Sequence, residues 1–473
     1  MHLSLFLPEL VLILMVVVLF FASLGNIKAG RLQGITLILA ALATLAAVAT
    51  FNQQGLMFYE AYRVDVYSQI FKIIITGSMF LVVFLGHGLS GVERQVKPEY
   101  YLFLTISSMG LVFLSSAVEL LTILLSLEIS SYALYVMIPL RSQDGFRMQM
   151  EAGIKYVLFG AASTGITLFG ISYIFGLTHS TYLTDLAKVI PGLLTSQPLT
   201  IIGMVMMLCG FFYKLAMFPM HFWTPDIYEG AANETTTFIA TVPKVGAVAL
   251  LIRLVFLVGV DVSQFTWVLA AFAVLSMTVG NLSALVQNDL KRLLAYSSIA
   301  HAGYVMVGIL SVGELGTSSA IYYILGYVIM NLACFYAIYN LAPEGGNVTF
   351  ADLKGLHRRS PLLAFTLGVG AFGMAGIPPT VGFTGKFVVF TAAIQKGFYA
   401  LVILGVINAA ISAFYYLKMV RAAYSQDDEQ QQDKVSLGIS AQLLGIALIL
   451  AILLIGIFPQ SFLDLAKQAV AVL

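Results

Sequence analysis

The sequence has little charge. Only 10% of its 473 residues are charged, whereas soluble globular proteins carry about 25%. Hydrophobic residues make up 60% of the chain, and no soluble fold needs so little polar surface. Lipid must therefore cover most of the outside. The formal net charge of +1 also argues against nucleic-acid binding, for which a basic patch or stripe is expected.

Cysteine is nearly absent. The two cysteines, Cys209 and Cys334, lie far apart inside apolar runs. This excludes a Cys-rich iron–sulfur or zinc framework within the chain, and it is typical of small packed residues. The sequence also lacks a Walker loop, a dinucleotide fingerprint and an HExxH motif, so nothing in it indicates catalysis on a soluble substrate.

Long apolar segments run through the whole sequence. A spanning helix needs about 20 mainly apolar residues, and the first segment lacks the basic region of a signal peptide. We therefore expect an all-α polytopic membrane protein with about fourteen transmembrane helices, near residues 5–24, 33–51, 68–86, 100–117, 119–139, 152–176, 199–222, 235–258, 264–285, 294–312, 319–341, 362–391, 399–422 and 437–458.

The basic residues of the loops are unevenly distributed. One set of alternate loops carries fifteen Lys and Arg residues; the other set, with the termini, carries four, namely Arg63, Lys188, Lys396 and Lys467. The positive-inside rule places the richer set in the cytoplasm. Both termini are then expected on the non-cytoplasmic side, which requires an even number of spans.

Two of the apolar segments are interrupted by proline. Pro219 breaks the seventh segment, and Pro378-Pro379 breaks the twelfth. Broken helices at matching positions are typical of inverted repeats in transporters. We therefore predict two inverted five-helix repeats, each with a broken helix. The expected units are helices 1–3 in residues 1–99, the two repeats in 100–258 and 259–424, and a loop with helix 14 in 425–473.

Six charged residues stand inside the apolar segments, where an ionised group costs about 2.5–3.5 kcal/mol on insertion scales. Lysine can lose its proton when it is desolvated, whereas arginine stays charged, so buried lysines beside a glutamate favour a proton path. The candidates are Glu128, Lys214, Lys244 and Lys386. Lys72 is expected to snorkel and Arg253 to lie toward a helix end, so both are set aside as structural.

The two helix breaks predict different surroundings for two of these lysines. Lys214 lies in the half-helix that ends at Pro219, where free carbonyls favour an ammonium group. Lys386 follows the second break, so the positive end of a new half-helix would disfavour its charge.

Four weaker candidates have ordinary alternatives. Glu151 and Lys155, spaced at i and i+4, form either a helix-surface pair or a relay at the membrane edge. His221 and His301, beside helix breaks or ends, are either proton shuttles or packed residues.

Two long motifs carry a family resemblance. The run from Asp289 to Tyr304 and the run from Lys214 to Gly230 resemble signatures of the proton-translocating antiporter-like subunits of respiratory complex I. Leu7-Pro8-Glu9-Leu10 and Gly385-Lys386-Phe387 resemble the subunit N branch of bacterial NADH–quinone oxidoreductase. The resemblance implies that Glu128 and Lys214 form the input pair, Lys244 the connecting lysine and Lys386 the distal site.

The resemblance also implies what accompanies the chain in a bacterial inner membrane. It predicts no cofactor or metal here, with quinone, NADH, FMN and iron–sulfur clusters in partner subunits that perform the redox chemistry. The implied partners are the antiporter-like subunits L and M, and the subunits A, J, K and H, of which the first three are small and the last holds the quinone site. Peripheral-arm redox subunits and membrane lipid complete the expected surroundings.

Other functions remain open at this point. A multi-subunit cation/proton antiporter shares the signatures but has no electron donor. A solute transporter would need a polar or aromatic substrate pocket at the breaks, and a purely scaffolding subunit would leave the stranded lysines unexplained.

Overall fold

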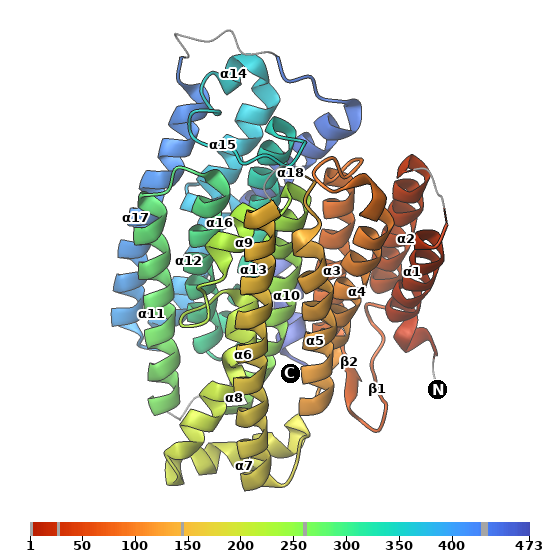
Figure 1. Ribbon diagram of the computed structural model, residues 1–473. Helices are drawn as coiled ribbons and strands as arrows, with labels where there is room; N and C mark the ends of the chain where they lie inside the picture. Colours follow the sequence, from red (N-terminus) through yellow and green to blue (C-terminus); the bar gives the residue numbers. More distant parts are fainter. Residues whose placement is uncertain (1–2, 26–28, 143–145, 259–262, 427–433) are drawn as a thin grey trace.

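The computed structural model is a bundle of helices that mostly run along one common direction (Figure 1). It describes residues 3–25, 29–142, 146–258, 263–426 and 434–473. Lys28, the junction between the two predicted repeats and most of the charged loop before Lys434 lie outside the described residues.

The first half of the described chain contains ten α-helices, three short 3-10 helices and one short hairpin. Their bounds are η1 Leu3–Phe6, α1 Leu7–Ser23, α2 Ala29–Ala49, β1 Gly55–Met57, β2 Tyr62–Val64, α3 Val66–Leu85, η2 Arg94–Val96, α4 Lys97–Ser116, α5 Leu120–Met137, η3 Ile138–Leu140, α6 Phe146–Thr178, α7 Leu183–Ser196, α8 Leu199–Leu215, α9 Thr224–Gly230 and α10 Asn233–Val258.

The described second half is helical apart from its loops. The helices are α11 Ser263–Leu285, α12 Leu290–Leu310, α13 Glu314–Leu341, α14 Leu356–Arg359, α15 Pro361–Ala375, α16 Val381–Gln395, α17 Tyr399–Tyr424, α18 Ile439–Ile457 and α19 Gln460–Val470.

The prediction of an all-α polytopic membrane fold is confirmed. Within the described residues, eleven helices are long and apolar enough to cross a membrane. The other three predicted segments correspond to α4, to α8 with the break that follows it, and to the interrupted helix α15/α16. The count of fourteen stays a prediction. Sequence reasoning missed the β1–β2 hairpin and the short helices α7 and α19, which are too short to span a bilayer.

The helices differ in how much of their surface the protein covers. The apolar windows of α10, α12 and α13 are 100%, 94% and 89% buried within the chain, whereas that of α6 is only 33% buried. Helix α10 accordingly runs through the middle of the bundle (Figure 1). A charged side chain in the middle of α10, such as that of Lys244, is therefore surrounded by protein.

Both broken helices end in the same way. At Ala216 and Gly376 the backbone turns left-handed, with φ of +63° and +86°. The next amide then reaches back over the last turn: Met217 N bonds Phe212 O, and Ile377 N bonds Phe372 O. This is a Schellman-type cap, in which some carbonyls of the last turn are satisfied and others stay free for side chains.

A second pair of matching contacts supports the predicted repeats. The residues around the start of α5 bond the segment between α6 and α7, through Leu120 N to Thr181 O and Leu183 N to Val118 O. The residues before α12 bond the loop after α13 in the same pattern, through Leu290 N to Val348 O and Phe350 N to Asn288 O. The two five-helix units thus share this contact as well as the broken helix, while the boundaries at 100–258 and 259–424 stay predictions.

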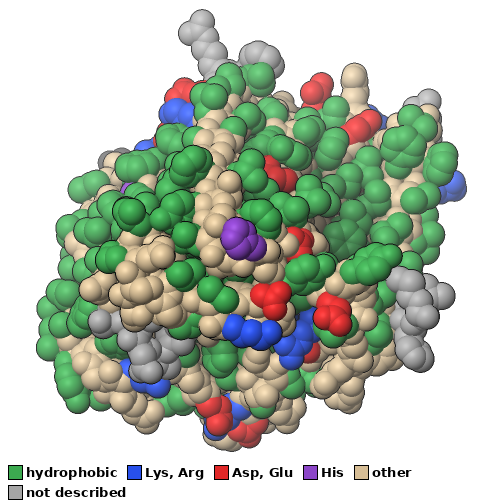
Figure 2. Space-filling view, turned by 90° about the horizontal axis from the view of Figure 1, so that it is seen from below, with side chains coloured by type: hydrophobic (Ala, Val, Ile, Leu, Met, Phe, Trp, Pro, Cys, Tyr) green, Lys and Arg blue, Asp and Glu red, His purple; other side chains and the backbone are tan. Residues whose placement is uncertain are grey.

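One end of the molecule holds the hairpin, α7 and both chain termini (Figure 1). The hairpin is tied to the C-terminal segment, because Arg63 Nη2 donates to Val472 O at 2.6 Å. Seen from this end, hydrophobic side chains dominate, one group of acidic and basic side chains lies below the centre of the view, and other charged side chains are scattered toward the rim (Figure 2).

Candidate functional site

The first predicted pair, Glu128 and Lys214, lies on the neighbouring helices α5 and α8. The two side chains form no ion pair in the described structure. Instead Lys214 Nζ donates to Ser131 Oγ at 3.1 Å, and Glu128 Oε1 accepts from Thr164 Oγ1 at 2.7 Å. Ser131 lies three residues after Glu128, so the two side chains share one face of α5.

Lys244 lies at the centre of the bundle and is 1% exposed. Its Nζ donates to Leu215 O at 3.3 Å, a carbonyl in the last turn of the broken helix α8. The ammonium also lies 5.7 Å from the centre of the Tyr327 ring. One backbone carbonyl and an aromatic face thus replace part of the hydration that the buried ammonium has lost.

Lys386 has the same kind of surroundings at the second break. Its Nζ donates to Met374 O at 2.9 Å and Ala375 O at 3.0 Å, and it lies 4.9 Å from the centre of the Tyr304 ring. The expectation that a positive helix end would disfavour this lysine is wrong. The side chain reaches back from α16 to the negative, carbonyl end of α15, which favours an ammonium group.

His301 joins the surroundings of these two lysines. The sequence suggested a position beside a helix end, but the structure places His301 in the middle of α12. Its ring centre lies 5.3 Å from that of Tyr327 and 5.7 Å from that of Tyr304, the two rings that face Lys244 and Lys386. The Tyr327 and Tyr304 rings, with the His301 imidazole between them, therefore form a continuous set of ring contacts from Lys244 to Lys386.

Both ring nitrogens of His301 have a hydroxyl partner. Nδ1 lies 2.8 Å from Tyr323 Oη, and Nε2 lies 3.2 Å from Tyr416 Oη, which itself bonds Ser297. An imidazole held at both nitrogens can take a proton on one side and release one on the other. Sequence reasoning missed these four tyrosines, because in a chain with 23 tyrosines nothing marks the buried ones.

His221 does not join this network. It lies between α8 and α9, and its ring packs against Phe218 and Phe222. Its Nδ1 atom is buried and has no hydrogen-bond partner among the described groups. Its position therefore matches that of a packed histidine beside the first break.

Glu151 and Lys155 belong to a larger ionic cluster. Lys155 Nζ lies 2.6 Å from both Glu151 Oε1 and Asp226 Oδ2, and Arg292 Nη1 lies 2.8 Å from Asp226 Oδ1 and 2.6 Å from Glu229 Oε2. The cluster connects α6 and α9 to α12. Asp226, Glu229 and Arg292 stand in the two signature motifs, but sequence reasoning did not single them out.

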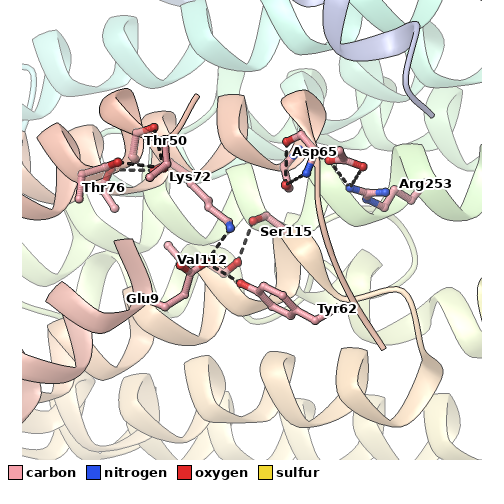
Figure 3. Close-up of polar contacts among 12 residues, drawn as sticks. Glu9, Thr50, Tyr62, Asp65, Lys72, Thr76, Val112, Ser115 and Arg253 are labelled. Atoms are coloured by element: carbon pink, nitrogen blue, oxygen red, sulfur yellow. Dashed lines mark hydrogen bonds and ion pairs between the residues drawn. The ribbon is translucent and has the colours of Figure 1, made fainter. Parts of the chain in front are cut away.

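Lys72 and Arg253, the two residues set aside as structural, each form a buried ion pair (Figure 3). Lys72 does not snorkel: its Nζ lies 2.6 Å from Glu9 Oε1, and both side chains are fully buried. Arg253 Nη2 lies 2.9 Å from Asp65 Oδ1. Sequence reasoning missed the partners Glu9 and Asp65, because they lie in other parts of the chain.

The described residues contain no group of three His, Cys, Asp or Glu side chains that could hold a metal ion. Cys209 and Cys334 are both buried and free. The placement of all cofactors in partner subunits stays a prediction.

Comparison with known proteins decides the family. The family model described as "NADH:quinone oxidoreductase/Mrp antiporter, TM" matches residues 117–412. The chain is 46% identical to "NADH-quinone oxidoreductase subunit N 2" of Opitutus terrae over 98% of this chain and 97% of that protein. This chain belongs to the subunit N branch of the antiporter-like family.

Solved structures agree with the membership in the antiporter-like family. A chain of respiratory complex I from Thermus thermophilus superposes with a TM-score of 0.84 at 30% identity, covering 97% of this chain and 99% of that one. A chain of the Mrp complex from Dietzia sp. reaches 0.86 at 18% identity, covering 100% and 97%, which shows a shared fold. The family resemblance predicted from the two motifs is confirmed.

The ionic cluster yields a prediction on stability. Burial raises the pKa of Asp226, but hydrogen bonds and charge from Lys155 and Arg292 outweigh this and hold the pKa below its ordinary value. The stabilisation is therefore present above the ordinary pKa and is lost as pH falls through the folded pKa. Because the groups are about one-third exposed, we expect Asp226→Asn to lower the free energy of unfolding at pH 7 by roughly 0.5–1 kcal/mol.

Thermal unfolding of the purified chain at pH 7 and at pH 3 checks this. The difference between Asp226→Asn and the unaltered chain should shrink at pH 3. Asp185→Asn, in the exposed pair with Lys188, is the control and should change neither curve measurably. A difference for Asp226→Asn that is as large at pH 3 as at pH 7 would contradict the ionic role.

Proposed function

We propose that this chain is a proton-translocating membrane-arm subunit of an NADH–quinone oxidoreductase. Protons would move along Glu128, Lys214, Lys244, His301 and Lys386, driven by quinone reduction in partner subunits. The observation that carries the proposal is the arrangement of Lys244 and Lys386. Each ammonium donates to the carbonyl end of a broken helix, and His301 with its tyrosines lies between them.

The chemistry of the side chains supports this proposal. Lysine can exist in both charge states in an apolar interior, whereas arginine cannot give up its proton. The carbonyl ends of α8 and α15 stabilise the charged form of Lys244 and Lys386 without neutralising it, because a carbonyl carries only a partial charge. Each lysine can therefore hold a proton and also release it.

The first part of the path is built from neutral hydroxyls. Ser131 accepts from Lys214 on the α5 face that also carries Glu128, and Thr164 donates to Glu128. A hydroxyl can accept one proton and donate another, so it can pass a proton without holding a charge. Lys214 and Lys244 are then linked through α8, since Leu215, the residue after Lys214, provides the carbonyl that Lys244 binds.

The wider assembly follows from the same proposal. The relative from Opitutus terrae is named as a subunit of NADH–quinone oxidoreductase, and the similar Thermus thermophilus chain belongs to complex I. We infer that the subunits L, M, A, J, K and H and the peripheral-arm subunits surround this chain. Quinone, NADH, FMN and iron–sulfur clusters would then serve the redox steps in those partners.

A cation/proton antiporter subunit is the second candidate. The observation that favours it is the shared fold with the Mrp complex chain from Dietzia sp.. The sequence relation is much closer to subunit N, at 46% identity against 18%. Co-purification of flavin and iron–sulfur subunits with this chain would distinguish the two, because a cation/proton antiporter has no electron donor.

The proposed proton path predicts the effect of removing Lys214. In inverted membrane vesicles, Lys214→Met and Lys214→Arg should each reduce proton pumping during quinone reduction by about 100-fold or more, because a positioned proton carrier is lost. Proton uptake is followed with a pH-sensitive dye, and the assembled complex is quantified in the same membranes.

Lys354→Met is the matched control, since Lys354 is an exposed lysine in the loop between α13 and α14, away from the proposed path. It should pump normally. Normal pumping by both Lys214 variants, with normal amounts of complex, would overturn the proposed path.

We also propose that both termini face the non-cytoplasmic side of a bacterial inner membrane, as the distribution of basic residues indicates. Single-cysteine variants test this, because both native cysteines are buried. In intact cells without an outer membrane, an impermeant maleimide should label Ser196→Cys near the termini, and it should leave Lys354→Cys unlabelled until the cells are opened. The opposite labelling pattern would reverse the orientation.

A further inference from the structure

Outside the proposed proton path, the described interior holds a buried cluster of ionisable groups in its N-terminal helices. Glu9 of α1, Tyr62 of β2 and Lys72 of α3 meet in the interior (Figure 3). Glu9 Oε1 accepts from Tyr62 Oη at 2.6 Å and lies 2.6 Å from Lys72 Nζ. We call these three residues the N-terminal triad. All three belong to the N-terminal helices and their hairpin, not to either predicted repeat.

Stability alone does not account for the triad. A buried ion pair costs several kcal/mol in desolvation per ion, and apolar residues of the same volume are often equally stable or more stable. In a chain with so few charges, an acid and a base are nevertheless buried together in α1 and α3. The alternative to a stabilising role is that the proton shared by this acid and this base has a function.

The triad lies within about one helical turn of the depth of the central lysine of the proposed path. Helices α3 and α10 are antiparallel neighbours: Tyr67 Oη bonds Ala249 O, and near the other end a Cβ at Gly86 would lie 3.1 Å from Glu234. With equal rise per residue in the two helices, the first contact places Lys72 opposite Lys244, and the second places it opposite Val248. The two lysines therefore lie within about one helical turn of each other along the α3–α10 interface.

A polar stripe leads from the triad to the end of the molecule. Along α3 the spacing of three and four residues puts one set of polar side chains on one face, and every member is at most 2% exposed: Asp65, Ser68, Gln69, Lys72 and Thr76. Among the described groups, neither polar atom of the Gln69 amide has a hydrogen-bond partner, and neither does Glu9 Oε2. Buried groups of this kind are normally satisfied by protein groups or by ordered water, so these atoms leave hydrogen-bonding positions for water along the stripe.

The stripe begins at the wall of a cavity. A cavity of about 1000 Å³, which we call the Asp65 cavity, lies at the end that holds the termini, and its lining includes Arg63, Asp65, Leu183, Lys188 and Arg253. Asp65 is held there by both arginines, with Arg63 Nε at 3.2 Å and Arg253 Nη2 at 2.9 Å. Seven residues, or two helical turns, separate Asp65 from Lys72 on the same face of α3.

We propose that the N-terminal triad is a further proton-carrying site, which connects the level of Lys244 to the Asp65 cavity along the polar stripe of α3. The inference rests on the proposed proton-translocating function. A proton passes from Lys72 Nζ to Glu9 Oε1 and leaves a neutral amine and a neutral carboxylic acid, with no net charge created. Glu9 then releases this proton to water toward the cavity, and Lys72 takes up another from the interior.

The decisive variant is Lys72→Arg. Arginine keeps the charge and the ion pair with Glu9, so it preserves a structural role, but it cannot release a proton. We expect normal amounts of complex and normal electron transfer in the presence of an uncoupler, but fewer protons moved per electron in inverted vesicles. The double variant Glu9→Leu/Lys72→Met, which removes both charges together, should give the same loss of pumping.

Tyr67→Phe is the matched control. It removes a buried side-chain hydrogen bond to α10 from the same helix but leaves the triad intact, so it should pump normally. Normal pumping by both Lys72→Arg and the double variant would overturn the proposal, and so would a loss of complex in both, since the triad would then be a structural requirement. If only one of them assembles, its pumping decides.

Lys214→Met measured in the same vesicles separates this proposal from the proposed function. Loss of pumping in Lys214→Met with normal pumping in the Lys72 variants overturns the triad alone. Normal pumping in all of them overturns the proton-translocating function as well.

Discussion

The structure depends on surroundings that keep a buried ammonium group charged and still let it release its proton. A partly solvated carboxylate at ion-pair distance holds the charge of a lysine, whereas a purely apolar site removes it. The carbonyl ends of the broken helices α8 and α15 lie between these extremes, and Lys244 and Lys386 each donate to one of them. Breaking a helix in the bundle is costly unless the free carbonyls accept hydrogen bonds. The lysines donate these bonds, and the carbonyls in turn stabilise the ammonium groups.

The same constraint explains where the rest of the chain places its charges. Permanent ion pairs lie at the edges of the bundle. The cluster around Asp226 connects α6 and α9 to α12, and the pair of Asp65 with Arg253 lies toward the opposite end of α10. Between them the central helices carry lysines, one histidine and hydroxyl groups. Glu9 with Lys72 is the exception, a close ion pair with no exposure, and this is why it stands out as a site for proton transfer.

Much of this arrangement is readable from the sequence, because the membrane limits the possibilities. Apolar runs of fixed length give the helices, proline gives the two breaks, and the signature motifs give the family. The sequence does not show toward which neighbouring groups a side chain points. Lys386 follows the break in sequence, yet it reaches back to the end of α15, which depends on how α16 packs there. The partners Glu9 and Asp65 and the four tyrosines around His301 were missed for the same reason, since tertiary packing alone brings them together.

The central claim is that buried lysines change their protonation state while the complex reduces quinone. Time-resolved infrared difference spectra of the complex, with lysine labelled by ¹⁵N, measure this directly. The account predicts isotope-sensitive bands of lysine ammonium groups during turnover, part of which disappear when Lys244 is replaced by Met. Spectra of an active, pumping complex without any lysine-dependent bands would contradict it.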